Sequence, residues 1–345
     1  MPLITGTGKP RVILGCMTFG PKEGARITSL DTYNQALDFF QGQGYSEIDT
    51  ARNYNDGAQE GFTREANWQS RGLTCATKCY PNEPGNHSPD QLEASLEKSL
   101  KELGTDCVDI FYLHAADRSI PFTEPLKKLN ELHKKGKFVR LGLSNFTAFE
   151  VAEVVMHCKY NNWVRPTIYQ GMYNAITRSL EQELIPTCRR YGLDVVVYNP
   201  IAAGLLAGRY KTKDVPQEGR FSGESKVGQN YRARYFKDET FDALRLVEEA
   251  ADKSGISMLD IALRWLVHHS ALNIKDGGND GIIIGMSSIQ QLEQNLKGLE
   301  GGPLPEEVLK KLDEAWLITK PNTANYWHLK LEYTYDTQKA LFAAT

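Results

Sequence analysis

Residues 73–114 read LTCATKCYPNEPGNHSPDQLEASLEKSLKELGTDCVDIFYLH, and this stretch outlines a complete strand–helix–strand unit. An apolar run over 73–78 ends in a lysine, and a second over 108–114 ends in a histidine. Between them, Ser88-Pro-Asp-Gln91 has the pattern of a capping box with proline at the first helical position. A leucine stripe at helical spacing then runs to a closing glycine: Leu92, Leu96, Leu100, Leu103 and Gly104.

The same alternation of apolar runs and helical segments continues in both directions. The runs are rich in Val, Ile and Leu, and until the seventh they start about 30 residues apart, which is typical of repeated strand–helix units. Near-continuous apolar character indicates strands covered on both faces, as in a parallel sheet. Eight units therefore predict an α/β fold, a (β/α)8 TIM barrel that forms a single domain over residues 1–345. The predicted strands are 11–16, 45–50, 73–78, 108–114, 138–145, 166–170, 194–200 and 281–286.

Helix starts and two irregular segments complete the outline. Residues 205–240 are polar and rich in Arg and Lys, and a loop of that length inside a compact domain is usually functional or disordered. Helices over about 238–253 and about 257–269, the second capped by Ser257, are predicted to follow. The tail, from about 317 to 345, is aromatic and is expected to cover either the site or a partner subunit. Further capping patterns lie at 147–150, 179–182 and 288–291.

Composition excludes several classes of function. The net charge of −3 and the pI near 6.2 supply no basic field for nucleic acid or an anionic membrane. No apolar run approaches the ~20 residues that span a bilayer. No secretory signal is expected from residues 1–10, and the final FAAT matches no peroxisomal or retention address. Six cysteines without CxxC spacing indicate free thiols in a reducing compartment, so a cytoplasmic protein is expected.

Four polar side chains lie at or just beyond the ends of three apolar runs: Asp49, Tyr54, Lys78 and His114. In a barrel of parallel strands, those ends reach one rim, where barrel enzymes carry their chemistry. Each residue alone has an ordinary explanation: a cap, a turn tyrosine, a solvated strand end or a core histidine. On successive strand ends of one barrel, an acid, a phenol, a cation and an imidazole favour a shared proton-transfer site.

These four residues, called the candidate tetrad below, are suited to protonating a developing alkoxide. Tyr54 would be the general acid, and Lys78 would lower the pKa of its phenol, which is ~10 when free. Asp49 would keep Lys78 charged and oriented, and His114 would bond a substrate carbonyl or relay the proton. The set has no evident nucleophile and no metal-ligand spacing, so no metal is expected and the matching partner would be a hydride donor.

Further strand ends have the features of a nucleotide site. Ser144, Asn145 and Gln170 offer hydroxyl and amide groups that could fix a carboxamide ring, and Tyr198 could stack on a flat ring. Residues 281–288 run directly into a helix start, which is a natural anion site. Helix capping alone would also explain that segment. No GxGxxG motif occurs, so a Rossmann domain is not expected.

Together these features resemble the aldo-keto reductase superfamily over nearly the whole chain, most closely its aflatoxin aldehyde reductase branch. Beside the candidate tetrad, the resemblance lies in FYLHAAD (111–117), GLSN (142–145), YNPIAAGLLAGRY (198–210), YRARY (231–235) and GMSSIQQLEQNL (285–296). It implies an aldo-keto reductase barrel that binds NADPH without a Rossmann fold and transfers hydride directly to an aldehyde or ketone. It also implies that Tyr54 is the proton donor.

The resemblance further implies where cofactor and substrate bind. The strand ends named above would hold the nicotinamide, a belt over 199–209 would cover the pyrophosphate, and Arg220 with segment 286–295 would hold the adenosine end. Substrate contacts would come from His114, Tyr231 and Arg234. The implied cofactor residues are Ser144, Asn145, Gln170, Tyr198, Asn199, Pro200, Ile201, Gly204, Leu205, Gly208, Arg209, Arg220, Met286, Ser287, Gln290, Gln291, Gln294 and Asn295.

The chain departs from that branch near its end. The similar reductases end soon after an Asn-Tyr-aromatic-Arg motif whose arginine helps bind acidic substrates. Asn325-Tyr326-Trp327-His328 stands at the corresponding place, and the chain continues to Thr345. An aromatic wall there would favour bulky or aromatic carbonyls over small acids.

Two other functions stay open at this point. Potassium-channel β subunits also resemble this fold, so an NADPH-binding regulatory subunit is an alternative, although the complete tetrad favours an enzyme. A lyase or isomerase on an ordinary barrel would leave the nucleotide-site residues unexplained. The expected partner is a small-molecule carbonyl of unidentified structure, with no nucleic acid and no membrane, and a homodimer is left open.

Overall fold

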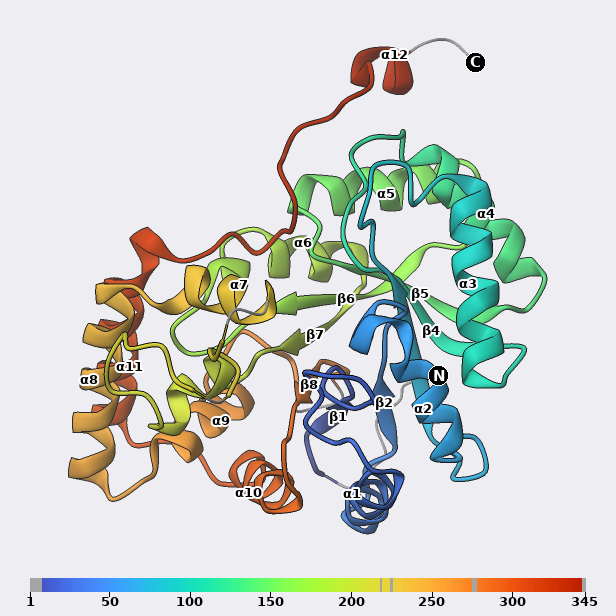
Figure 1. Cartoon of the computed structure of the whole chain (residues 1–345). Helices are drawn as coiled ribbons and strands as arrows, with labels where there is room; N and C mark the ends of the chain where they lie inside the picture. The colour runs from blue at the N-terminus through green and yellow to red at the C-terminus, as the bar shows by residue number, and fades with distance from the viewer. Residues whose placement is uncertain (1–7, 218, 224–225, 275–277, 343–345) are drawn as a thin grey trace.

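Eight parallel strands form a closed barrel in the computed structural model, which describes residues 8–217, 219–223, 226–274 and 278–342 (Figure 1). Each strand pairs with the next, and β8 returns to β1, with Ile13 opposite Ile283. The predicted (β/α)8 fold is confirmed. The strands are β1 (Arg11–Gly15), β2 (Glu47–Asp49), β3 (Thr74–Cys79), β4 (Val108–Leu113), β5 (Phe138–Ser144), β6 (Pro166–Met172), β7 (Asp194–Tyr198) and β8 (Gly281–Ile284).

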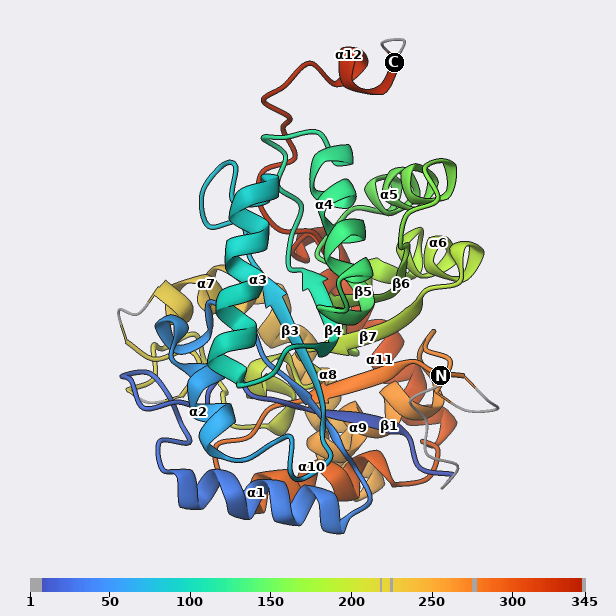
Figure 2. The same cartoon turned by 90° about the vertical axis from the view of Figure 1, so that its right-hand side faces the viewer.

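Helices surround the strands, as Figure 2 shows for α3 to α6. Within the described ranges, no helix combines the length and apolar character that a membrane span requires. The α-helices are α1 (Leu30–Gly42), α2 (Gln59–Glu65), α3 (Pro89–Leu103), α4 (Thr123–Lys134), α5 (Ala148–Tyr160), α6 (Leu184–Tyr191), α7 (Lys226–Tyr235), α8 (Asp238–Ser254), α9 (Met258–His268), α10 (Ile289–Leu299), α11 (Glu306–Thr319) and α12 (Thr337–Phe342). Short 3-10 helices are η1 (Tyr54–Gly57), η2 (Ser179–Glu181), η3 (Ala202–Ala207) and η4 (Lys320–Asn322).

Most of the predicted helix starts are present. Thr147 forms a complete capping box with Glu150, and Ser257 and Ser288 also accept bonds from the first turns of their helices. Helix α3 begins where predicted, but the Ser88 side chain makes no capping hydrogen bond, so a capping box there is wrong. The first turn of α3 depends instead on Pro89, whose fixed φ suits a helix start.

The helix predicted to open at 179–182 begins later. Those residues form only η2, and α6 starts at Leu184. Pro186 explains the difference: it stands in the first turn of α6, where its missing N–H is not needed. Had the helix continued from 179, the same proline would have removed an interior hydrogen bond.

The interval 205–240 is not a continuous loop. It contains the end of η3 and the whole of α7, whose Tyr231 and Tyr235 are four residues apart and therefore share a face. The buried Phe221 ring lies 6.2 Å from that of Tyr231 and 6.4 Å from that of Tyr235, and it stacks on Phe236 at 4.7 Å. The Tyr235 hydroxyl also accepts from Asn174 Nδ2 at 3.2 Å, which attaches this aromatic cluster to the chain just after β6.

Two apolar regions support the fold. The larger lies between the strands and the helices, and a smaller one fills the barrel interior. Members of the interior group come from β1, β3, β4, β6, β7 and β8, and on β4 Ile110 and Tyr112 are two residues apart, so they share one face of the pleated strand. Gly142 belongs to this interior because an added Cβ would lie 2.3 Å from the Tyr112 ring. The interior residues are Ile13, Ala76, Ile110, Tyr112, Ile168, Val196 and Ile283.

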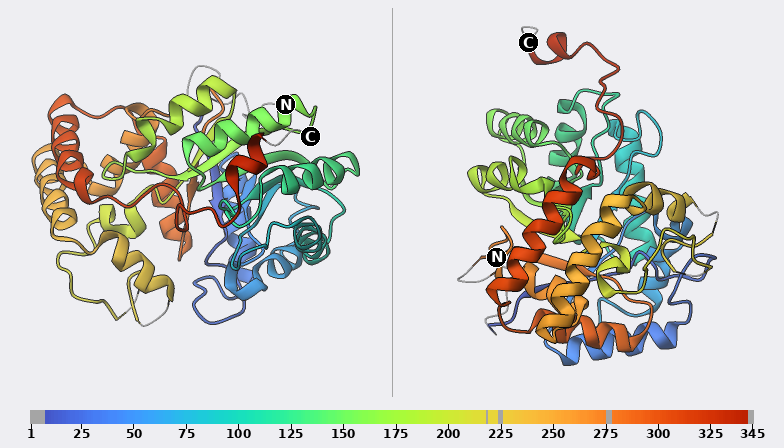
Figure 3. Two further views of the ribbon diagram at one scale, coloured as in Figure 1. Left: turned by 90° about the horizontal axis from the view of Figure 1, so that it is seen from above. Right: turned by 90° about the vertical axis from the view of Figure 1, so that its left-hand side faces the viewer.

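The chain ends outside the barrel. Helices α8 and α11 lie side by side on its outer surface, and after η4 the chain crosses to the rim near α6 (Figures 1 and 3). Helix α12 then stands away from the barrel in two perpendicular views (Figures 1 and 2). Residues 1–7 and 343–345, parts of the segments in which no targeting signal was found, lie outside the described residues.

Candidate active site

Lys78 is the centre of a hydrogen-bonded group at the carboxyl rim of the barrel. Its buried ammonium, near the end of β3, donates to Asp49 Oδ1 at 2.5 Å, to the Thr50 carbonyl oxygen at 2.7 Å and to the Tyr54 hydroxyl at 3.2 Å. These bonds use every N–H of the ammonium, so β2 and the turn after it fix its position. The structure thus brings three members of the candidate tetrad together.

Asp49, the last residue of β2, is bonded through both carboxylate oxygens. Oδ1 accepts from Lys78, and Oδ2 accepts from Gln170 Nε2 on β6 at 2.9 Å. Gln170 was predicted to bind a carboxamide ring, and its link to the tetrad acid was not anticipated. Because Asp49 and Lys78 are both buried, each depends on the other for charge compensation.

The Tyr54 phenol is held in its protonated form. Burial raises its pKa well above the ordinary value, the negative charge of Asp49 raises it further, and the positive charge of Arg220 opposes the shift. Desolvation is the largest influence on this pKa, and the effect of Lys78 on the phenol stays a prediction. Such a phenol can still give its proton to an alkoxide, which is a much stronger base than a phenolate.

His114 follows β4 and faces the same space. Its ring stands edge-on to Tyr54 at 5.9 Å and to Tyr80 at 5.3 Å. Burial lowers the pKa of His114 well below its ordinary value, and the charge of Lys78 acts in the same direction, so the imidazole is neutral. Its buried Nδ1 has no hydrogen-bond partner among the described residues. A buried ring nitrogen without a partner can form a hydrogen bond with a ligand that binds at this rim.

Three of the four predicted nicotinamide-binding side chains form one network at the ends of β5 and β7. Asn145 Nδ2 donates to the His114 carbonyl oxygen at 2.9 Å and to Ser144 Oγ at 3.0 Å, and the Tyr198 hydroxyl donates to Asn145 Oδ1 at 2.8 Å. Asn145 adopts a left-handed backbone with φ of 57°. These polar groups are thus next to the tetrad and bond one another.

The predicted belt over 199–209 is an unusual stretch of backbone. Five of its residues have positive φ: Asn199, Ala202, Ala203, Gly204 and Gly208. Asn199 stabilises this path, since its Oδ1 accepts from the Ala203 amide at 2.7 Å and its Nδ2 donates to the Tyr235 hydroxyl at 2.5 Å. Left-handed turns expose backbone N–H groups that can bind anions, and such backbone concentrates at functional sites. Within the belt Pro200 and Leu205 are buried, Ile201 is half-buried and Arg209 is exposed.

The β8–α10 connection forms helix-capping contacts, which were the alternative explanation of its sequence. Ser288 Oγ accepts from the Gln291 amide at 3.3 Å, and Gln291 Oε1 accepts from the Ser287 amide at 3.0 Å. Asn295 is buried and donates to the Gly285 carbonyl oxygen at 3.1 Å. Among the other residues predicted to hold the adenosine end, Met286 is buried, whereas Gln290 and Gln294 are exposed.

Arg220 lies with the predicted substrate residues. Its guanidinium is 5.3 Å from the centre of the Tyr231 ring, and that of Arg234 is 5.4 Å from the same ring. Arg220 also acts electrostatically on Tyr54. Neither guanidinium forms a hydrogen bond or ion pair with another described residue. The structure therefore groups Arg220 with Tyr231 and Arg234, and no such bond joins it to segment 286–295, where the adenosine end was predicted.

The terminal segment reaches this site through His328. The His328 Nε2 atom lies 3.3 Å from the Tyr198 hydroxyl, and its ring is 6.1 Å from that of Tyr80. Burial, and then the charge of Arg234, lower the pKa of His328 to about 4, so this imidazole is neutral near pH 7. Tyr80 was not predicted. Strand alternation could have identified it, because Tyr80 lies two residues after Lys78 and its side chain therefore faces the same side of the strand.

A buried ion pair holds the terminal segment in place. Arg118 and Glu150 form two parallel bonds of 2.6 and 3.0 Å, and Arg118 Nη1 also donates to the His328 carbonyl oxygen at 2.9 Å. The Tyr333 hydroxyl donates to Glu150 at 2.7 Å, and the Thr334 amide donates to the Arg118 carbonyl oxygen at 3.0 Å. The tail is therefore attached to the barrel as far as residue 334, and His328 is the part of it that reaches the site.

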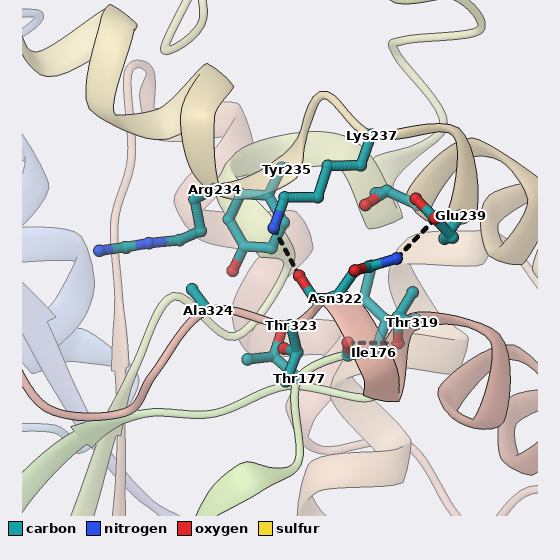
Figure 4. Close-up of a pocket in the computed structure, with 11 residues that line it drawn as sticks. Ile176, Thr177, Arg234, Tyr235, Lys237, Glu239, Thr319, Asn322, Thr323 and Ala324 are labelled. Carbon is teal, nitrogen blue, oxygen red and sulfur yellow. Dashed lines mark hydrogen bonds between the residues drawn. The ribbon is translucent and has the colours of Figure 1, made fainter.

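A separate small pocket lies where α7, α8 and η4 meet (Figure 4). Lys237 donates to the Asn322 carbonyl oxygen, and Asn322 Nδ2 donates to Glu239 Oε1 at 2.6 Å. Arg234 borders this pocket, but its guanidinium extends away from the other lining residues in Figure 4. No tetrad residue lines the pocket, and no cluster of His, Cys, Asp or Glu among the described residues could hold a metal ion.

Comparison with known proteins gives a consistent result. The model of the aldo/keto reductase family matches residues 11–317. The chain is 42% identical over 330 residues to mouse aflatoxin B1 aldehyde reductase member 2, covering 92% of this chain and 88% of the relative. It is also 42% identical over 330 residues to human aldo-keto reductase family 7 member A3, covering 92% of this chain and 97% of the relative. Identity to an aldo-keto reductase of Pseudocercospora fijiensis is 41% over 297 residues, covering 84% and 99%.

Proposed function

The chain belongs to the aldo/keto reductase family and is an oxidoreductase acting on carbonyl compounds, and from that premise we propose that it reduces an aldehyde or ketone with NADPH, using Tyr54 as proton donor. The observation that carries the proposal is the bonding of Lys78. Its ammonium joins the Tyr54 hydroxyl to the Asp49 carboxylate, in the same space that His114 faces. When bound, NADPH supplies the hydride.

The protein's own part in the reaction is to orient the carbonyl and deliver a proton. His114 is neutral, so it can donate a hydrogen bond to the carbonyl oxygen without competing for the proton. Tyr54 keeps its proton until an alkoxide develops, and Lys78 stabilises the phenolate that remains. Asp49 accepts a hydrogen bond from Lys78 and so holds the ammonium in the position that this role requires.

Several features support a dinucleotide at the same rim. The Asn145–Tyr198 pair and Ser144 present amide and hydroxyl groups beside the tetrad, and the left-handed backbone over 199–208 is suited to phosphate oxygens. The α10 start would contribute to the adenosine end, and the exposed Arg209 to the pyrophosphate. Arg220 was assigned there from sequence, but its contact with Tyr231 favours a role nearer the substrate.

The substrate and the setting are part of the same proposal. Tyr80, Tyr231 and His328 make the mouth of the site aromatic, which suits bulky or aromatic carbonyls. All six cysteines are free thiols, which fits a reducing cytoplasm. A small-molecule carbonyl is the proposed partner, and a homodimer remains compatible with the exposed apolar residues of α12.

Carbonyl-dependent oxidation of NADPH tests this function. Purified protein is mixed with NADPH and a panel of aromatic and aliphatic aldehydes, and the loss of cofactor absorbance is followed. We expect turnover that depends on the aldehyde and is lost in Tyr54→Phe. Tight NADPH binding without turnover of any panel member would favour a regulatory subunit instead.

A further inference from the structure

Tyr54 stands at the start of a turn whose backbone is left-handed, although the Ala58 amide closes the turn by donating to the Asn55 carbonyl oxygen at 3.1 Å. Asn55, Asp56 and Gly57 follow it with φ of 47°, 49° and 80°, so three consecutive residues are left-handed. Side chains disfavour this region, and asparagine and aspartate only tolerate it. The position of the Tyr54 hydroxyl on Lys78 therefore depends on contacts from outside the turn.

Arg52 provides such contacts from both its backbone and its side chain. Its amide donates to the Lys78 carbonyl oxygen at 3.0 Å, which attaches it to the end of β3. Its guanidinium donates through Nη2 to the Gly57 carbonyl oxygen, at the end of the turn, and through Nη1 to Glu60. A Cβ at Gly57 would lie 2.8 Å from Nη2, so the guanidinium lies directly against the turn.

Glu60 fixes the other end of this arrangement. It lies on α2 with no exposed surface, and its Oε1 accepts from Thr77 Oγ1 at 2.6 Å. Thr77 directly precedes Lys78 on β3, and the two side chains point to opposite faces of the strand. Burial raises the pKa of Glu60, and the charge of Arg52 opposes that shift.

We infer that Arg52 and Glu60 are positioning residues that hold the Tyr54 hydroxyl against Lys78, connecting the turn of the proton donor to the strand that carries its cationic partner. They do not touch substrate or cofactor; they act through Tyr54. This inference rests on the proposed function, because it concerns proton delivery by the same tyrosine. A structural role alone would weaken folding, whereas positioning of the donor affects the reaction only while the Tyr54 hydroxyl is present.

A double-mutant cycle tests this distinction. Arg52→Ala and Glu60→Gln are each made in the wild-type and in the Tyr54→Phe chain, and single-turnover NADPH oxidation is measured at saturating aldehyde. In the wild-type background we expect the rate to fall about tenfold to a hundredfold, the effect of a small misplacement of a reacting group. In the Tyr54→Phe background we expect a change of less than about twofold, because the hydroxyl that the pair positions is already absent.

Controls separate this effect from loss of structure. Arg71→Ala is the matched arginine variant, since Arg71 bonds Asp38 and Asn34 on the outer surface, away from Tyr54. It should leave the rate unchanged, and all variants should keep NADPH affinity by fluorescence titration. Arg52→Lys serves if the alanine variant does not fold; one ammonium cannot reproduce the fork between Gly57 and Glu60, so its rate should also fall.

The outcomes are distinct. Equal losses in the two backgrounds, or an Arg52→Ala rate equal to that of Arg71→Ala, would overturn the positioning role and leave Tyr54-dependent reduction intact. A wild-type protein that reduces no carbonyl would overturn the proposed function and this inference with it.

Discussion

The Lys78 Nζ atom lies 3.2 Å from the Tyr54 hydroxyl oxygen and 4.8 Å from the centre of the same ring. One cation therefore contacts both the hydroxyl oxygen and the π-system of the proton donor. The lysine also bonds Asp49. Removing its charge would therefore leave the buried Asp49 carboxylate without a compensating positive charge. The chemistry of Tyr54 and the stability of the barrel rim are thus linked.

Tyr54→Phe is expected to remove most carbonyl reduction and leave NADPH affinity nearly unchanged. The substitution deletes the proton donor, and loss of a positioned general acid costs on the order of 10²–10⁴ in rate. Steady-state kinetics combined with fluorescence titration measures both quantities. Wild-type turnover in this variant would show that Tyr54 is not the donor.

Lys78→Met is expected to impair both turnover and folding. It removes the stabilisation of the phenolate, and it leaves the buried Asp49 unpaired, which typically costs about 3–5 kcal/mol of unfolding free energy. Adding Asp49→Asn should restore much of that stability without restoring turnover. Urea unfolding and kinetics of the single and double variants check this, and recovery of activity in the double variant would contradict the assigned role.

His328 is expected to make the protein less stable in acid. Burial lowers its pKa to about 4 in the folded protein, against 6.5 as the ordinary value. As the pH falls, this imidazole is therefore protonated in the unfolded chain at a higher pH than in the folded protein. Stability should therefore fall as the pH drops from 6.5 to about 4, and each unit of pKa difference corresponds to about 1.4 kcal/mol.

Thermal unfolding of wild type and His328→Gln across that pH range measures the effect. The slope should be smaller in the variant, although His114 is shifted in the same direction and preserves part of it. Identical slopes would mean that the His328 imidazole titrates normally in the folded protein.

NADPH is expected to bind at least about tenfold more tightly than NADH, since charge-assisted contacts to the 2′-phosphate contribute roughly 1.5–3 kcal/mol each. Fluorescence titration with both cofactors measures the preference, and equal affinities would contradict it.

Arg220→Ala should reduce aldehyde turnover more than it reduces NADPH affinity, because Arg220 contacts Tyr231. Loss of the preference in that variant would return Arg220 to the adenosine end.

Two truncations are expected to differ. Removing residues 336–345 deletes α12, which stands away from the barrel, and should leave KM for bulky aldehydes unchanged. Removing 329–345 also deletes the contacts of Tyr333 and Thr334 with the Arg118–Glu150 pair, and should raise KM by releasing His328. Kinetics of both forms across an aldehyde panel tests this, and equal KM values would exclude a role for the tail in the site.

Much of the architecture could be predicted from local patterns. Each strand is a short apolar run whose ends are marked by polar residues, so its bounds were predicted to within two residues. Parallel strands in a closed barrel must bring their carboxyl ends to one rim, and this is why Asp49, Lys78 and His114 could be grouped from sequence. The errors were local: Pro186 delayed α6, and aromatic spacing in 226–235 was not recognised as a helix.

The sequence by itself determined the order of the strands, the rim on which the chemistry lies and the identity of its acid, phenol, cation and imidazole, because these follow from periodicity along the chain. Only the tertiary structure decided which groups bond one another. Gln170 reaches Asp49 across 121 positions, and Arg118 holds His328 across 210, through pairings that no local pattern encodes. Burial was decided there as well: it raises the pKa of Tyr54 despite the adjacent lysine, since desolvation depends on every element that closes over the site.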